Sequence, residues 1–141
     1  MTYRQQHQSL MQFGGTLSLL KAKATDEEKL ERILAAWEPE MYDRMAYWLS
    51  VCYDTKTVPF EPIPFKTGGG VYKDDPITTP MELIDLLDGG LNAEEAEAIL
   101  EDMEKNMFRP AYETFRDILT RDLSKHNMSV ELAGILMEAL A

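Results

Sequence analysis

Residues 79–103 read TPMELIDLLDGGLNAEEAEAILEDM, and this stretch decides the fold class. Its first four residues, Thr79–Glu82, carry a helix start signal, because the threonine and glutamate side chains satisfy free backbone N–H groups and proline fits the first helical position. Leucine and isoleucine follow at helical spacing until Gly89-Gly90, where glycine ends the helix by allowing positive φ. A second start signal stands at Asn92, three residues before a glutamate. Two helices joined by a tight turn are therefore predicted.

The same pattern extends to most of the chain. Residues 4–22 form a weaker helical segment, in which Gly14-Gly15 predicts a break or kink. Apolar residues at helical spacing follow each of the remaining start signals, which stand at Thr25, Pro39, Pro110 and Ser129. We therefore expect an all-α fold, a compact bundle of six to seven helices that forms a single domain over residues 1–141.

Residues 54–79 break the helical pattern. Four prolines exclude helix, and Gly68-Gly69-Gly70 gives the backbone freedom. The segment also contains four residues that are too apolar for a free linker: Val58, Phe60, Ile63 and Phe65. We expect a long Pro/Gly-rich loop that lies on the helical core with its glycine tip exposed, and a loop of this length is usually functional or mobile.

The composition indicates a globular, acidic protein of 141 residues with a net charge of −11. Residues 1–75 contain nine basic and eleven acidic side chains, whereas residues 76–141 contain five basic and fourteen acidic ones. This charge argues against non-specific binding to nucleic acid. The polar N-terminus, the single cysteine (Cys52) and the lack of a long apolar run predict a cytoplasmic protein without a membrane segment.

Motifs for catalysis and metal binding are missing from the sequence. His7 and His126 lie far apart and lack ligand spacing, so no zinc site is expected. Asp74-Asp75 and the acids of residues 94–104 lack the spacing of a calcium loop. No phosphate-binding glycine loop is present, and no serine or cysteine has a base nearby in sequence. We expect no cofactor, no metal and no enzymatic activity of the chain by itself.

Three stretches in order resemble the N-terminal, all-helical DNA-binding domain of ATP-dependent DNA ligases of the tailed-phage type. They are LERILAAWEPEMYDRMAYWLSVCYDTKTVPFEPIP (30–64), MELIDLLDGGLNAEEAEAILEDM (81–103) and ETFRDILTRDLSKHNMSVELAGI (113–135). Two departures stand out. The turn after Arg121-Asp122-Leu123 lacks the family's glycine, and no Lys-x-Asp-Gly adenylation motif is present, since Lys73-Asp74-Asp75-Pro76 does not match it.

The resemblance implies a non-catalytic domain that grips duplex DNA near a nick through minor-groove sugar and phosphate contacts, in DNA repair or replication, with a catalytic ligase domain as a candidate partner. The contacts that it implies are Gly89, Gly90, Asn92, Arg121, Lys125, Asn127 and Ser129. On composition alone we add Lys66, Thr67, Gly68 and Lys73 from the loop. Asn92 and Ser129 are equally explained as helix caps, and Arg121 as a partner in a salt bridge to a neighbouring helix.

An alternative interpretation makes the chain a small, acidic, phage-type protein-binding module or inhibitor. It would present carboxylates to a basic, nucleic-acid-binding partner, and its face would consist of Glu94, Glu97, Glu101, Asp102 and Glu104. The two interpretations differ in where the basic side chains lie. DNA binding requires them to gather away from the acids, whereas scattering among carboxylates opposes it.

Overall fold

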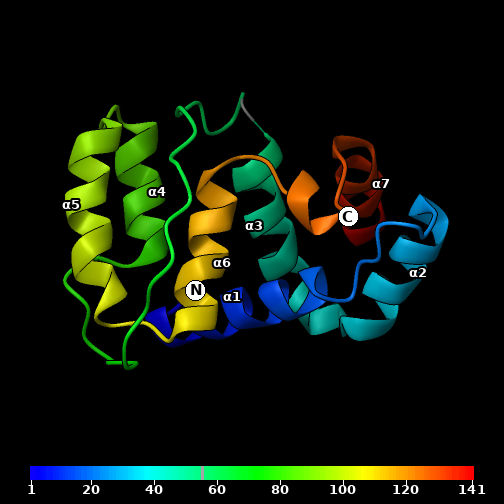
Figure 1. Cartoon of the computed structure of the whole chain (residues 1–141), viewed down its shortest axis with the longest axis horizontal. Helices are drawn as coiled ribbons and strands as arrows, with labels where there is room; N and C mark the ends of the chain where they lie inside the picture. Colours follow the sequence, from blue (N-terminus) through cyan, green and yellow to red (C-terminus); the bar gives the residue numbers. More distant parts are fainter. Residues whose placement is uncertain (55) are drawn as a thin grey trace.

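A computed structural model describes residues 1–54 and 56–141, and every regular element in these residues is helical (Figure 1). The elements are α1 (Tyr3–Leu17), α2 (Asp26–Ala36), the 3-10 turn η1 (Pro39–Met41), α3 (Tyr42–Tyr53), α4 (Pro80–Asp88), α5 (Ala93–Glu104), α6 (Arg109–Leu119), the 3-10 turn η2 (Ser124–His126) and α7 (Val130–Leu140). The predicted all-α bundle of six to seven helices is confirmed.

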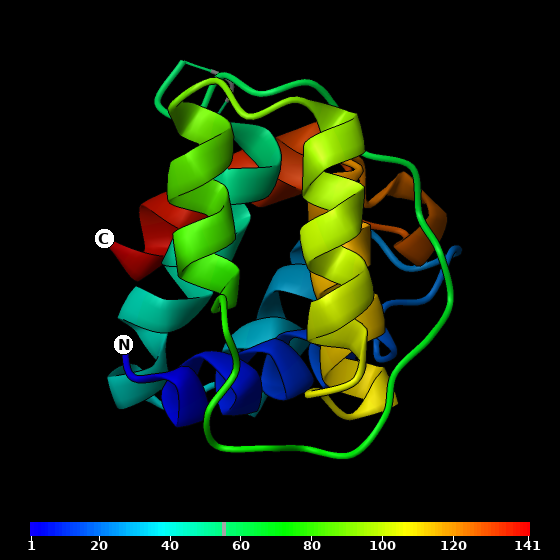
Figure 2. The same ribbon diagram turned by 90° about the vertical axis from the view of Figure 1, so that its left-hand side faces the viewer.

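The helices are arranged along one long axis (Figure 1). α4 and α5 stand side by side at one end, and α2 and α7 lie at the other (Figures 1 and 2). α1 crosses beneath the central helices α3 and α6 and packs against both. Large, fully buried side chains fill the core at the centre of the molecule. Among them are Trp48 of α3 and Phe115 of α6, whose rings pack edge to face. Among the described residues, none of the helices is both long enough and apolar enough to cross a membrane.

The helix ends follow the predicted start signals. At α4, the Glu82 N–H donates to Thr79 Oγ1 and the Thr79 N–H donates to Glu82 Oε1. Asn92 and Glu95 exchange the same two bonds at α5. Reciprocal capping of this kind satisfies backbone donors that a helix leaves free at its first turn.

The break predicted at Gly14-Gly15 is wrong, because α1 runs without interruption from Tyr3 to Leu17. A Cβ on Gly14 would lie 2.1 Å from Thr114 Oγ1 of α6, so the missing side chain lets the two helices approach closely. Glycine lowers helix propensity by about 1 kcal/mol, and packing against α6 overrides that local preference. The glycine marks a helix contact and not a helix end.

The long loop lies on the core as expected, but its glycines do not form an exposed tip. Residues 63–73, which we call the strap, run along the α5–α6 region (Figure 2). The Gly68 N–H donates to Glu113 Oε2 (3.1 Å), and the Gly69 N–H donates to Glu104 Oε1 (3.3 Å). A Cβ on Gly69 would lie 2.3 Å from the backbone of the first residue of α6. Glycine is needed here because the backbone N–H groups of the strap form the hydrogen bonds, and a side chain on Gly69 would collide with the start of α6.

Candidate functional site

Two of the four basic residues singled out in the sequence form ion pairs with carboxylates. The Lys66 Nζ lies 3.5 Å from Glu97 Oε2. The Lys125 Nζ lies 2.6 Å from Asp117 Oδ1 and 3.8 Å from the centre of the Phe65 ring. Both cations therefore already have an internal anion, which lowers the positive potential that they could offer to a phosphate.

Arg121 binds the long loop and forms no salt bridge to a neighbouring helix among the described residues. Its guanidinium donates to the backbone carbonyls of Asp54, Val58 and Phe60, and it lies 4.3 Å from the centre of the Phe60 ring. Desolvation by burial lowers the pKa of Arg121. The side chain thus fixes the start of the loop. Lys73, by contrast, is exposed and has no ion-pair partner among the described residues.

The turn residues implied by the resemblance have structural roles. Asn92 and Ser129 accept N–H groups at the starts of α5 and α7. Asn127 has a positive φ of 65°, and its side chain donates to the Leu20 carbonyl. Gly89-Gly90 is exposed at the α4–α5 turn. This turn and η2 lie on opposite sides of the strap and α6 (Figure 1), so the two sets of turn residues do not form one surface.

All the excess negative charge of residues 76–141 lies in α4, α5 and the turn between them, which we call the acidic hairpin (residues 80–104). The hairpin contains nine carboxylates and no lysine or arginine, whereas residues 105–141 contain five acidic and five basic side chains. The nine are Glu82, Asp85, Asp88, Glu94, Glu95, Glu97, Glu101, Asp102 and Glu104. The two helices of the hairpin stand side by side at one end of the molecule (Figure 2), so these carboxylates belong to that end.

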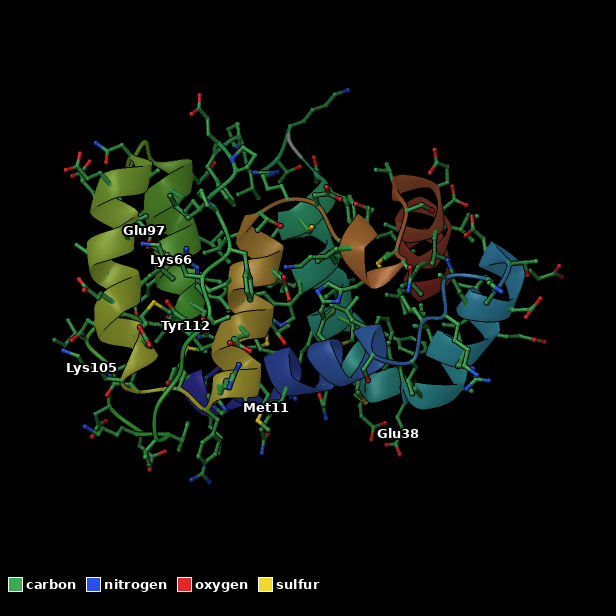
Figure 3. All side chains as sticks on the ribbon, in the orientation of Figure 1. Met11, Glu38, Lys66, Glu97, Lys105 and Tyr112 are labelled. Carbon is green, nitrogen blue, oxygen red and sulfur yellow. The ribbon has the colours of Figure 1, made fainter. Side chains whose placement is uncertain are left out.

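A groove of about 380 Å³ lies between α5 and the strap. Residues from both sequence interpretations line it, together with Tyr112 of α6, which is only 2% exposed. The labelled side chains of Glu97, Lys66 and Tyr112 follow one another between α5 and α6 (Figure 3). The lining residues are Lys66, Thr67, Glu94, Glu97, Ala98, Glu101, Glu104 and Tyr112. The structure thus brings together Lys66 and Thr67 of the predicted DNA contacts with four of the five predicted acids.

Two residues of the acidic face predicted from the sequence, Glu97 and Glu104, already bind other parts of the chain. Glu97 accepts hydrogen bonds from both terminal nitrogens of Arg116, at 2.8 and 2.9 Å. Arg116 lowers the pKa of Glu97, and Lys66 contributes in the same direction. Glu104 accepts the Gly69 N–H of the strap. Glu94 and Glu101 remain exposed, and neither has an ion-pair partner among the described residues.

Arg116 is a residue that the sequence analysis missed. Its side chain is completely buried, and it also donates to the Pro64 carbonyl at the start of the strap, so it joins α6, α5 and the strap. In the sequence, Arg116 directly follows Phe115, and it lies on the apolar face of α6. A charged residue at a buried helix position indicates an internal partner, because a buried arginine requires one, and this signal could have identified Arg116.

Neither a reactive thiol nor a metal-binding cluster is found among the described residues. Cys52 is buried, and burial raises its pKa to about 12, which keeps the thiol protonated and unreactive. In this part of the chain, no three His, Cys, Asp or Glu residues are grouped in a way that could hold a metal ion. What the groove offers is a row of carboxylates beside a buried phenol.

Comparisons of the chain with protein-family models, with curated proteins and with solved structures found no match.

Proposed function

We propose that this chain is a protein-binding module whose acidic hairpin presents carboxylates to a basic partner. The observation that carries the proposal is the segregation of charge, with nine acids and no base in residues 80–104 at one end of the molecule. A one-sign surface of this kind steers an oppositely charged partner and rejects others.

The positions of the basic side chains support this choice over DNA binding. Lys66 and Lys125 are paired with carboxylates, and Arg121 binds loop carbonyls. Lys66 moreover lies beside α5, where a phosphate would meet Glu94 and Glu101. Gripping duplex DNA near a nick stays an untested prediction of the resemblance, and the experiment below includes it.

The proposal is tested by fluorescence anisotropy with two probes, a capped glycine–lysine peptide and a nicked DNA duplex, each titrated at low and moderate salt. The test variant neutralises three exposed acids of the hairpin, Asp85→Asn, Glu94→Gln and Glu101→Gln. A control variant removes the same charge far from the hairpin, with Glu31→Gln, Glu131→Gln and Glu138→Gln, all at exposed positions of α2 and α7.

We expect salt-sensitive binding of the peptide that weakens about tenfold in the hairpin variant, on the basis of about 0.5 kcal/mol for each exposed charge. The control variant should weaken it far less. Equal losses in the two variants would refute the proposal, because binding would then follow net charge alone. Salt-sensitive binding of the nicked duplex without binding of the peptide would favour the ligase-type interpretation instead.

A further inference from the structure

A pocket of about 700 Å³ lies between α2 and the residues that precede this helix, at the end of the molecule opposite the acidic hairpin (Figure 1). We call it the α2 pocket. Three basic side chains line it, Lys21 from the segment before α2, and Lys29 and Arg32 from α2 itself. Because Lys29 and Arg32 are three positions apart, they share one face of the helix. The pocket therefore gathers positive charge from two segments of the chain.

The three cations of the α2 pocket have no anionic partner inside the protein. In the part of the chain that the structure describes, none of them forms an ion pair with a carboxylate. This separates them from Lys66 and Lys125, which are paired with carboxylates. Two acids, Glu28 and Glu31, also line the pocket. Glu28 accepts a hydrogen bond from Thr25 Oγ1 at 3.2 Å, so its carboxylate is used at the start of α2.

Lys29 is an independent sign of an anionic ligand, because it is buried without a counter-charge. It is only 9% exposed, and its Nζ donates to the Asn127 carbonyl at 2.8 Å. A lysine ammonium has three N–H donors, and lysine is rarely buried to this degree unless it is paired. A carbonyl accepts one of these donors but leaves the positive charge uncompensated. An anion in the pocket that Lys29 lines would supply the missing charge.

The size and the charge of the lining select a small ligand. Three cations and two carboxylates give the lining a net charge of +1, which suits one anionic group. A polyanion such as nucleic acid would also bring further phosphates towards Glu28 and Glu31. Leu19 and two alanines supply apolar surface beside the charges. The volume lies within the range of about 300–1,000 Å³ that is usual for small-molecule sites.

We propose that the α2 pocket binds a small organic anion through a carboxylate or phosphate group. Lys29 and Arg32 hold the anionic oxygens, since the guanidinium fork matches two oxygens of either group. Lys21 contributes charge from the opposite segment, and the apolar part of the ligand lies against Leu19. The site is separate from the acidic hairpin, so it does not depend on the proposed function.

The first test is a titration of the ¹⁵N-labelled chain with benzoate and with phenyl phosphate, followed by nuclear magnetic resonance at physiological salt. We expect saturable shifts in residues 19–35 with millimolar affinity, as is reasonable for ligands of about ten non-hydrogen atoms. Phenol, the neutral analogue, should bind at least about tenfold more weakly, because it lacks the charge-assisted hydrogen bonds. The tighter of the two anions identifies the anionic group. If neither anion gives saturable shifts there, or if phenol binds equally well, the inference is overturned.

Two matched pairs of variants separate the pocket from net charge. Lys21→Gln should weaken binding of the tighter probe about threefold, whereas Lys23→Gln, at an exposed lysine outside the pocket lining, should not. Glu31→Gln should tighten binding about threefold, whereas Glu27→Gln, at an exposed acid of the same helix outside the lining, should not. Equal effects within either pair overturn the inference, because binding would then follow net charge.

Lys29→Met and Arg32→Gln test the two groups that hold the anion. Each should weaken binding about tenfold or more, because each removes a charged hydrogen-bond donor. Arg32 is exposed, so Arg32→Gln tests the site even if Lys29→Met does not fold. Unchanged affinity in Arg32→Gln overturns the inference, as does tighter binding of a nicked DNA duplex to the same residues. The hairpin variant should bind the probe normally, since its charges are distant and screened by salt, so the two proposals can fail separately.

Discussion

Arg116→Met tests the buried ion pair that joins α6 to α5 and the strap. The substitution keeps the length and the apolar part of the side chain but removes three hydrogen bonds, two to Glu97 and one to the Pro64 carbonyl. Removing one member of a buried pair costs about 3–5 kcal/mol. Two features place this case at the lower limit: the Glu97 side chain is 28% exposed and can regain water, and the Arg116 Nε is buried without a hydrogen-bond partner.

We therefore expect Arg116→Met to lower the free energy of unfolding by about 3 kcal/mol. With an unfolding entropy of about 2.1 cal/mol/K per residue, a chain of 141 residues loses about 10 °C in melting temperature. Far-ultraviolet circular dichroism during thermal and urea unfolding measures both quantities.

A double-mutant cycle with Glu97→Gln separates the ion pair from the rest of the effect. The two single variants and the double variant should give a coupling energy of about 2 kcal/mol, since each residue loses the same partner. A loss below about 1 kcal/mol in Arg116→Met, or strictly additive effects in the double variant, would show that the pair does not hold these three segments together.

Three further predictions concern single contacts. Gly14→Ala should destabilise the protein by about 1–3 kcal/mol through the clash with Thr114, and adding Thr114→Ala should recover most of that loss in urea unfolding. His7 accepts the Phe108 N–H through Nε2, and burial lowers the pKa of His7 in the folded chain. The contribution of His7 to stability is therefore complete above its unfolded pKa of about 6.5 and is lost as the pH falls through the lower folded pKa. His7→Gln should therefore flatten the fall in urea midpoint between about pH 7 and pH 5, and an unchanged pH profile would contradict this. Gly69→Ala would place a Cβ at a φ of 142° and against the backbone of Arg109, which destabilises the strap locally. Amide hydrogen exchange in the strap should therefore accelerate, while exchange in α3 stays unchanged.

The helices could be predicted because their signals are local. Thr79, Asn92 and Ser129 each cap the helix that follows within three residues, so a short window of sequence contains both partners. The same locality explains why the excess of acids in residues 76–141 and the acidic residues 94–104 could be recognised from the sequence, since these are neighbouring residues.

The rest of the site depends on contacts between distant residues. Gly14 has the sequence signature of a helix break, and only the approach of Thr114, a hundred residues later, makes it a packing position. Glu97 has the signature of a solvated acid, and only the buried Arg116 together with Lys66 gives it a structural role. No pattern along the chain contains such pairings, because they arise from the packing of helices and strap against one another.

The packing of α1 against α6 has a consequence for the order in which the chain folds during synthesis. α1 is made about a hundred residues before α6, and at 5–20 residues per second this means a delay of roughly 5–20 s between the two helices. Throughout that interval the apolar side of α1, with Leu10 and Phe13, lacks the part of its native cover that α6 supplies, even though α3 is already made. A nascent chain stalled before residue 109 should therefore be captured by chaperones, whereas one stalled after α6 has left the exit tunnel can close its core.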